Sequence, residues 1–244
     1  MIIPKMLRSC VLISVITCVA CADTPVLVEL FTSEGCSSCP PADQLLAKLE
    51  SQQPVSGVHI IALSEHVDYW DRLGWRDPFS SAQFTNRQQE YSQAFRDNGP
   101  YTPEMIVDGV SGFVGNQSSD ALKVITEAAH AAKAAVRISV ANGKITIQAD
   151  GVKKPADVVV AITESNLLSN VSRGENAGRK LTHTAVVRWL RVAGKTRPNE
   201  PFSGEIAISL DKNWKAANLH AVVFLQERSS RKVLGAMETP LSMP

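Results

Sequence analysis

Two short apolar runs near the beginning of the chain enclose a segment with helical spacing. Residues 26–31 (VLVELF) and 58–63 (VHIIAL) are almost wholly apolar, as expected of strands buried on both faces of a sheet. Between them, the leucines of residues 45–49 share one face of a predicted helix, and Pro40 or Pro41 is well placed in its first turn. The pattern therefore predicts a β-α-β unit with parallel strands and a right-handed crossover.

Residues 64–99 break this pattern with a stretch rich in aromatic and charged side chains. The helical spacing of its later aromatic residues predicts one helix. Two short strands are predicted at 104–108 and 110–114, followed by a helix over about 119–134. We interpret residues 23–135 as an α/β domain in which residues 64–99 form an aromatic-rich insertion.

After residue 135 the spacing of apolar residues changes to every second position. Residues 136–140 alternate between apolar and polar side chains, and Asn142-Gly143 is typical of a tight hairpin turn. Further runs of strand length follow without helical spacing. Residues 136–244 are therefore predicted to form a β-sandwich-like domain of roughly immunoglobulin size. The expected fold class is an α/β domain followed by an all-β domain.

The first 22 residues have the pattern of a secretory signal peptide. A short cationic stretch precedes the apolar run 11–20, and Ala20-Cys21-Ala22 fits the small-x-small pattern of a cleavage site. The apolar run is shorter than the roughly 20 residues that a membrane-spanning helix needs. We expect residues 1–22 to be removed and the mature protein, without a transmembrane helix, to be periplasmic or secreted. Lipid attachment at Cys21 is the alternative.

Composition and cysteine usage narrow the function classes. The formal net charge is +1, so the chain lacks the basic excess of a nucleic-acid-binding protein. Of its 5 cysteines, Cys10, Cys18 and Cys21 belong to the leader, and Cys36 and Cys39 remain. Outside the cytosol disulfides form and persist, so these two cysteines are each other's natural partner.

The spacing of Cys36 and Cys39 suits thiol chemistry at the beginning of a helix. Free N–H groups and the helix dipole stabilise a thiolate there, and the thiolate is the reactive form of cysteine. Cys36 would be the nucleophile and Cys39 the resolving thiol. One such pair lacks the four ligands of a structural zinc site, whereas a purely structural disulfide stays open as an alternative.

A second segment, Tyr101-Thr102-Pro103 followed by EMIVDG, resembles the cis-proline loop and edge strand of the thioredoxin superfamily. That resemblance implies a thioredoxin-like fold with Pro103 facing the dithiol and Thr102 holding the substrate chain. Thioredoxins also carry a buried acid in the strand before the dithiol, and the resemblance implies that Glu29 relays a proton to the resolving sulfur. Glu29 stands in an otherwise apolar run, where a charged residue is uncommon.

The mature chain as a whole resembles a family of exported bacterial proteins catalogued as a domain of unknown function. The resemblance rests on ELFTSEGCSSCPPAD, HVDYWDRLGWRDPFSS and TPEMIVDG, and it continues through GENAGRKLTH into the β-rich half. It implies an exported protein with a thioredoxin-like fold and a C-terminal β-rich region. The activity of that family is not established.

The insertion begins with chemistry-bearing residues that follow the second strand directly. His66, Tyr69 and Trp70 lie at the same predicted sheet edge as the dithiol, and we expect them to bind substrate or gate access to it. The alternative is a lid whose aromatic residues only pack on the domain.

The favoured function is a thiol-disulfide oxidoreductase of the cell envelope. It would act through Cys36 and Cys39 on exported protein thiols or disulfides, with an unidentified redox partner and no cofactor. One alternative is a non-catalytic binding module with a structural disulfide. The other is copper or metal handling through Cys36, Cys39 and His66.

Overall fold

The computed structural model describes residues 23–241. The predicted signal peptide, residues 1–22, lies outside the described residues. Within residues 23–241, no helix is both long enough and apolar enough to cross a lipid bilayer.

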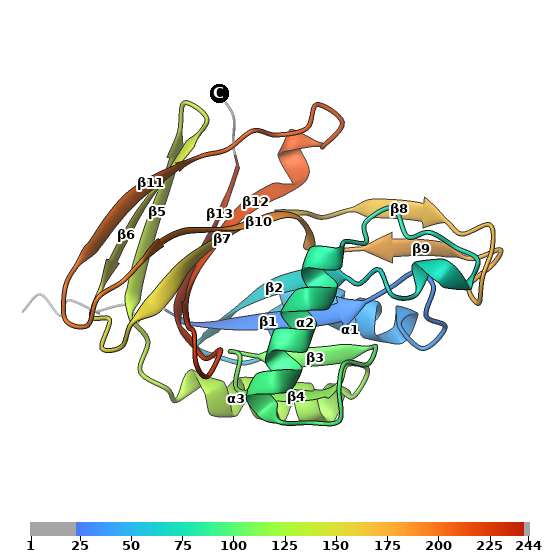
Figure 1. Ribbon diagram of the computed structural model, residues 1–244, viewed down its shortest axis with the longest axis horizontal. Coiled ribbons are helices and arrows are strands. Elements are labelled where there is room, and N and C mark those ends of the chain that lie inside the picture. Colours follow the sequence, from blue (N-terminus) through green and yellow to red (C-terminus); the bar gives the residue numbers. More distant parts are fainter. Residues whose placement is uncertain (1–22, 242–244) are drawn as a thin grey trace, which may run out of the picture.

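The largest sheet among the described residues is an eight-stranded mixed sheet with the strand order β13-β12-β7-β10-β2-β1-β3-β4 (Figure 1). Its strands are β1 (Thr24–Thr32), β2 (Val58–His66), β3 (Glu104–Val107), β4 (Ser111–Val114), β7 (Ala156–Glu164), β10 (Val186–Lys195), β12 (Leu219–Glu227) and β13 (Val233–Pro240). The predicted β-α-β unit is present, because β1 and β2 pair in parallel and α1 (Pro40–Gln52) connects them.

The remaining elements cover this sheet or extend from it. A three-stranded sheet has the order β11-β6-β5, and β8 and β9 form a separate two-stranded hairpin. These strands are β5 (Ala135–Ala141), β6 (Lys144–Asp150), β8 (Leu167–Asn170), β9 (Lys180–His183) and β11 (Phe202–Ala207). The helices besides α1 are η1 (Asp71–Leu73), α2 (Ala82–Phe95), α3 (Ser118–Ala129) and η2 (Ala216–Asn218).

The predicted fold class, a thioredoxin-like α/β domain followed by an all-β sandwich, is wrong. Strands make up 41% of the described residues and helices 21%, and the large sheet takes strands from both predicted parts. The join lies between β2 and β10, where Val186 pairs with Ser64. Because β2 lies between β1 and β10, the sheet continues into strands of the predicted second domain instead of ending at β2.

The pattern of burial explains why β7 and β12 belong to this sheet. Both strands are buried along nearly their whole length, as β1 is. A sandwich strand has one covered face, whereas a strand with both faces covered is apolar at successive positions. Residues 158–162 (VVVAI) show this continuous apolar pattern. They form the centre of the large sheet rather than one wall of a separate domain.

Three apolar clusters cover the two faces of the sheet. On one face, α2 packs over a cluster that contains Leu27, Phe31 and Val159. On the other face, α1 and α3 cover the neighbourhood of Val28, and the three-stranded sheet covers β7 and β12 around Val160. This layering places the beginning of α1 at the carboxyl end of β1, beside the β8–β9 hairpin (Figure 1).

Candidate functional site

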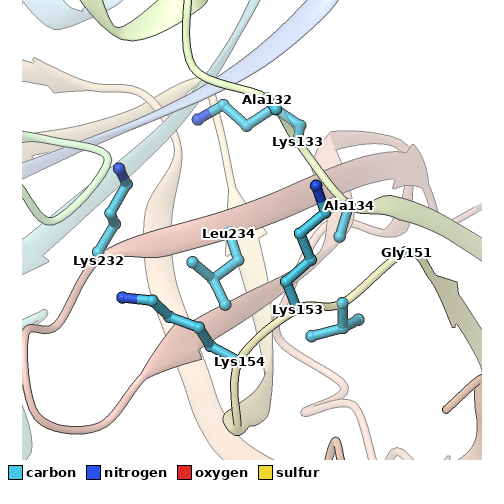
Figure 2. A pocket seen from close by; sticks show the side chains of 9 residues that line it. Ala132, Lys133, Ala134, Gly151, Lys153, Lys154, Lys232 and Leu234 are labelled. Carbon is cyan, nitrogen blue, oxygen red and sulfur yellow. The ribbon is translucent and has the colours of Figure 1, made fainter. Parts of the chain in front are cut away.

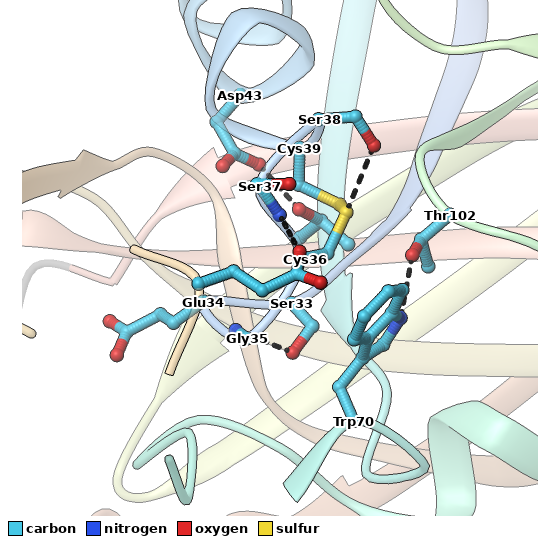
Figure 3. Close-up of a disulfide and its surroundings, with 12 residues drawn as sticks. Ser33, Glu34, Gly35, Cys36, Ser37, Ser38, Cys39, Asp43, Trp70 and Thr102 are labelled. Carbon is cyan, nitrogen blue, oxygen red and sulfur yellow. Dashed lines mark hydrogen bonds between the residues drawn. A yellow bond between two sulfur atoms is a disulfide. The ribbon is translucent and has the colours of Figure 1, made fainter. Parts of the chain in front are cut away.

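Cys36 and Cys39 form a disulfide in the turn between β1 and α1 (Figure 3). Cys39 is the N-cap of α1, and Pro40 occupies the first helical position, where its missing N–H costs nothing. The Cys39 N–H donates to the Cys36 carbonyl, with 3.2 Å between nitrogen and oxygen. The local sequence therefore holds both sulfur atoms at the N-terminal end of the helix.

The proline loop lies beside this turn. The Thr102–Pro103 peptide bond is cis, as the resemblance to thioredoxins implies. A Cβ atom built on Gly115 would lie 3.3 Å from Pro103 Cβ and 3.4 Å from Ala42 Cβ, so the proline packs close to the first turn of α1. The chain thus brings the two cysteines and the Thr102–Pro103 pair to one place.

Trp70 joins the proline loop to the disulfide turn. Its Nε1–H donates to Thr102 Oγ1 at 2.8 Å. Its Cβ lies 3.0 Å from the position that a Cβ on Gly35 would take, so Gly35 permits the close approach. Figure 3 shows the indole ring beside Cys36 and Thr102. Both cysteine residues have an exposed fraction of 0%, although Ser37 and Ser38 between them are exposed.

Because Trp70 lies beside the turn that holds the buried disulfide, Trp70→Ala is expected to speed the reduction of the disulfide by dithiothreitol. An increase of roughly tenfold corresponds to a barrier lowered by about 1.4 kcal/mol through better access. Quenched alkylation followed by mass spectrometry measures the rate. Trp214→Ala is the matched control, since Trp214 packs on the cluster between the two sheets. An unchanged rate in a folded Trp70→Ala protein would show that the indole does not restrict access.

The connection between β8 and β9 contributes two residues that sequence reasoning did not assign to the site. The buried Asn176 side chain donates from Nδ2 to the carbonyls of Glu34 and Cys36, both at 2.9 Å. The Ser37 N–H donates to Glu175 Oε2 at 2.9 Å, and this bonding lowers the pKa of Glu175. Both residues belong to the GENAGRKLTH segment, which is part of the family resemblance. No local pattern in that segment predicts that it folds onto the cysteine turn.

His66 does not lie on the surface of the site but beneath it. It is fully buried, and its Nδ1 lies 2.7 Å from Asp77 Oδ2. Burial opposes the charged imidazolium of His66, but the nearby carboxylates, led by Asp77, outweigh it and raise its pKa. Burial also opposes the Asp77 carboxylate, but His66 and two backbone N–H donors lower the pKa of Asp77. His66 cannot touch a substrate in this arrangement.

A second buried imidazole lies next to His66. The ring centroids of His66 and His183 are 5.0 Å apart, and His183 Nε2 lies 3.0 Å from Glu34 Oε1. Glu34 Oε2 accepts from Trp75 Nε1 at 2.7 Å. Residues 136–244 were predicted to form a separate domain, so a contact between His183 and Glu34, 149 positions apart in the sequence, was not expected.

Tyr69 lies next to Trp70 but contacts α2 instead of the cysteine turn. Its hydroxyl donates to Gln88 Oε1 at 3.2 Å, and burial raises the pKa of Tyr69 to about 12. Gln88 Nε2 donates in turn to Glu104 Oε2 at 2.7 Å, and burial raises the pKa of Glu104 to about 7. Tyr69 therefore connects the insertion to the strand that follows Pro103.

The structure does not bring Glu29 to the sulfur atoms. Glu29 lies on the α2 face of β1, whereas Val28 on the next position packs with α1. Its carboxylate accepts from Arg87 Nε at 2.8 Å and from the Tyr91 hydroxyl. Arg87 Nε also lies 3.2 Å from Glu65 Oε1. Glu29 thus belongs to a buried ion-pair network on the opposite face of the sheet.

A pocket of about 290 Å³ lies where the α3–β5 connection meets the β6–β7 and β12–β13 connections (Figure 2). Four lysines surround its apolar floor: Lys133, Lys153, Lys154 and Lys232. Lys133 pairs with Asp108, and Lys154 Nζ lies 3.1 Å from Glu227 Oε1. None of the residues around the disulfide lines this pocket.

Metal binding gains no support from the geometry. In the part of the chain that the structure describes, no group of three or more His, Cys, Asp or Glu side chains is arranged to hold a metal ion. Cys36 and Cys39 are bonded to each other, and His66 Nδ1 faces Asp77.

The fold and the site define a mixed-sheet protein with a disulfide at a helix N-terminus, beside a cis-proline loop whose Thr102 is bonded to Trp70. The chain belongs to a family described as "Protein of unknown function (DUF1223)", whose model matches residues 27–226. This match spans both halves of the chain and includes the disulfide, the proline loop and Asn176.

A crystal structure of protein AGR_C_4864 from Agrobacterium tumefaciens is similar over most of its length. It has 28% sequence identity and a TM-score of 0.75, and the alignment covers 91% of this chain and 96% of that one. A domain of the outer membrane lipoprotein Omp28 from Porphyromonas gingivalis has 13% identity and a TM-score of 0.27, with 45% of this chain and 88% of that chain covered. No curated protein matches the chain.

Proposed function

We propose that the protein is an exported thiol-disulfide oxidoreductase that exchanges disulfides with other exported proteins. The observation that carries this proposal is the Cys36–Cys39 disulfide at the N-terminus of α1, with the cis Thr102–Pro103 bond packed beside it. Free N–H groups at a helix N-terminus stabilise a thiolate, which is the attacking species in exchange. The pattern of a signal peptide supports a location outside the cytosol, where client disulfides exist.

Exchange in the reducing direction takes two steps. The Cys36 thiolate attacks a client disulfide, a mixed disulfide forms, and one client sulfur leaves as a thiolate. Cys39 then loses its proton and attacks Cys36 Sγ, so that the Cys36–Cys39 bond forms and the second client sulfur leaves. Two electrons pass to the client. The reverse sequence oxidises a client dithiol, and the reduction potential of the pair sets the favoured direction.

Thr102 and Trp70, two of the predicted substrate-binding residues, lie beside the disulfide turn, which supports a role in binding a client chain. Thr102 precedes the cis-proline, and its hydroxyl accepts from Trp70 in the described state. In this proposal a client chain that binds along the proline loop replaces the Trp70–Thr102 hydrogen bond, which frees Thr102 for contact with the client. Tyr69 does not face the cysteine turn, and its hydroxyl donates a hydrogen bond to Gln88 of α2.

The test is the reduction potential of the mature protein together with its exchange activity. The protein is equilibrated with glutathione buffers, and its capacity to reduce insulin or oxidise a reduced client is measured. An exchange protein is expected to have a potential between about −270 and −120 mV, the range spanned by known dithiol oxidoreductases. Absence of exchange in both directions would refute the proposal.

A non-catalytic module with a static disulfide is the second candidate, and the burial of both sulfur atoms favours it. A structural disulfide is expected to have a potential below about −300 mV. The same glutathione titration therefore separates the two candidates, because a static bond stays oxidised across the whole series of buffers.

A further inference from the structure

Five ionisable side chains are buried together behind the disulfide. They are Glu34 in the cysteine turn, Asp43 on α1, His66 on β2, Asp77 after η1 and His183 on β9. Three carboxyl groups and two imidazoles in so small a volume are costly unless protons are shared among them. Such a cluster can store and release protons inside the protein.

Asp43 is the member of the cluster nearest in the chain to Cys39, the resolving cysteine. It lies four residues after Cys39 in a continuous helical turn, and its N–H donates to the Cys39 carbonyl at 3.1 Å. Residues four apart on a helix are side-chain neighbours. Figure 3 shows the Asp43 carboxyl group on the α1 side of the disulfide. Burial raises the pKa of Asp43, while His183, His66 and the Thr32 hydroxyl, at 2.8 Å, oppose that rise.

The cluster extends from Asp43 towards the outer surface. His66 Nε2 and His183 Nδ1 are buried atoms without a hydrogen-bond partner among the described residues. His183 also lines an open pocket of about 530 Å³, together with Glu50 and His220. An imidazole with one nitrogen unpartnered can accept and release a proton, and His183 is the member of the cluster that borders this pocket.

We infer that Asp43 exchanges a proton with the Cys39 thiol during disulfide exchange, and that His66 and His183 pass this proton to and from the pocket that His183 lines. This inference rests on the proposed function. When the disulfide opens, an incoming thiolate forms a bond to Cys36 Sγ, the Cys36–Cys39 bond breaks, and the Cys39 thiolate takes the proton of Asp43. When it closes, Cys39 returns the proton to the Asp43 carboxylate and attacks Cys36 Sγ, the bond between Cys36 Sγ and the client sulfur breaks, and the client sulfur leaves as a thiolate.

The burial of Cys39 makes such a partner necessary. A sulfur atom without solvent exposure cannot exchange its proton directly with water, yet the resolving step needs the thiolate. Glu29 cannot supply this partner, because its carboxylate is bonded to Arg87 on the other face of the sheet. Asp43 is the proton partner of Cys39, and His66 and His183 carry the proton between Asp43 and the pocket.

The test is Asp43→Asn in the mature protein, with the resolving step followed by stopped flow against a fluorescent mixed disulfide on Cys36. General acid-base catalysis contributes roughly 100-fold or more, so the resolving rate is expected to fall by about that factor. The variant is also expected to lose the slowing that wild-type protein shows in D₂O. The alkylation rate of Cys36 in the reduced variant should stay within about twofold of wild type, because that reaction does not use Cys39.

Asp120→Asn is the matched control, since Asp120 lies in the first turn of α3. It is expected to keep the wild-type rate. A folded Asp43→Asn protein with the wild-type resolving rate and D₂O dependence would overturn the inference. If wild-type protein does not exchange at all, the proposed function itself fails, which is a different result from a slow variant of an active protein.

Thr32→Val tests the same role without removing the carboxyl group. The Thr32 hydroxyl lowers the pKa of Asp43, so its loss raises that pKa and is expected to move the pH profile of the resolving step to higher pH. His183→Gln is expected to slow the step, with partial rescue by added imidazole through the adjacent pocket. An unmoved profile in Thr32→Val, in a protein that folds, would also overturn the inference.

Discussion

Cys36→Ser is expected to abolish disulfide exchange, whereas Cys39→Ser is expected to accumulate mixed disulfides with client proteins. A serine hydroxyl at position 36 cannot form the first mixed disulfide, so no later step occurs. Without the Cys39 thiol, the first step still takes place but the mixed disulfide is not resolved. Non-reducing electrophoresis and mass spectrometry of envelope extracts from cells that express each variant measure the difference.

The double variant Cys36→Ser/Cys39→Ser is the control, because it has neither thiol and should trap nothing. Equal amounts of trapped client with Cys36→Ser and Cys39→Ser would contradict the assignment of Cys36 as the nucleophile. A complete lack of trapped clients with Cys39→Ser would support the static disulfide instead. The two cysteines are buried to the same extent, so this comparison does not depend on unequal access.

The β-α-β unit could be predicted because its signals are local. Residues 26–31 and 58–63 are continuous apolar runs, and the leucines between them have helical spacing. Strand partners are a different matter, because an apolar run shows that a strand is buried and not which strand lies beside it. The pairing of Val186 with Ser64 joins segments 122 positions apart in the sequence, since 186 − 64 = 122. For this reason one sheet was predicted as parts of two domains.

The candidate site shows the same division between local and long-range information. The cysteine pair and the Thr102–Pro103 loop carry short motifs, and the structure places them together. Asn176 and His183 come from the β8–β9 hairpin, and nothing in their own neighbourhood of the sequence indicates a contact with the cysteine turn. Buried partners of this kind follow from the course of the whole chain.

Glu29 illustrates how a correct observation can lead to an incomplete interpretation. A glutamate in an apolar run does indicate a buried group with a partner. Strand alternation places it on the face opposite α1, where Leu27 and Phe31 also point. Its partner is Arg87 of α2. Predicting this would have required knowing that α2 crosses that face of β1.

Arg87→Met is expected to lower the free energy of unfolding by about 3–5 kcal/mol at pH 7, which is the usual cost of removing one member of a buried ion pair. The variant leaves the carboxyl groups of Glu29 and Glu65 fully buried without their cation. Methionine keeps most of the side-chain length, so the loss is electrostatic rather than a cavity. Urea denaturation followed by circular dichroism, with the disulfide intact, measures the change.

The pH dependence of this loss identifies its cause. Burial, reinforced by the neighbouring Glu29 carboxylate, raises the pKa of Glu65 well above its usual value, and Arg87 opposes that rise. Without Arg87 this pKa rises further. A carboxyl group whose pKa is higher in the folded than in the unfolded state destabilises the fold as pH rises. The deficit of Arg87→Met relative to wild type should therefore be larger at pH 8 than at pH 5.

Glu29→Gln in the Arg87→Met background is expected to recover a large part of the lost stability, because it removes one of the two uncompensated carboxyl groups and leaves the Tyr91 hydroxyl an acceptor. Arg228→Met is the matched surface control. Its partner, Asp157, forms an exposed ion pair with it, and such pairs contribute little to stability. An Arg87→Met protein as stable as wild type at every pH would show that the ion pairs of Arg87 make no net contribution to the free energy of unfolding. Full recovery by Glu29→Gln would instead show that the loss of stability in Arg87→Met comes from the Glu29 carboxylate alone and not from Glu65.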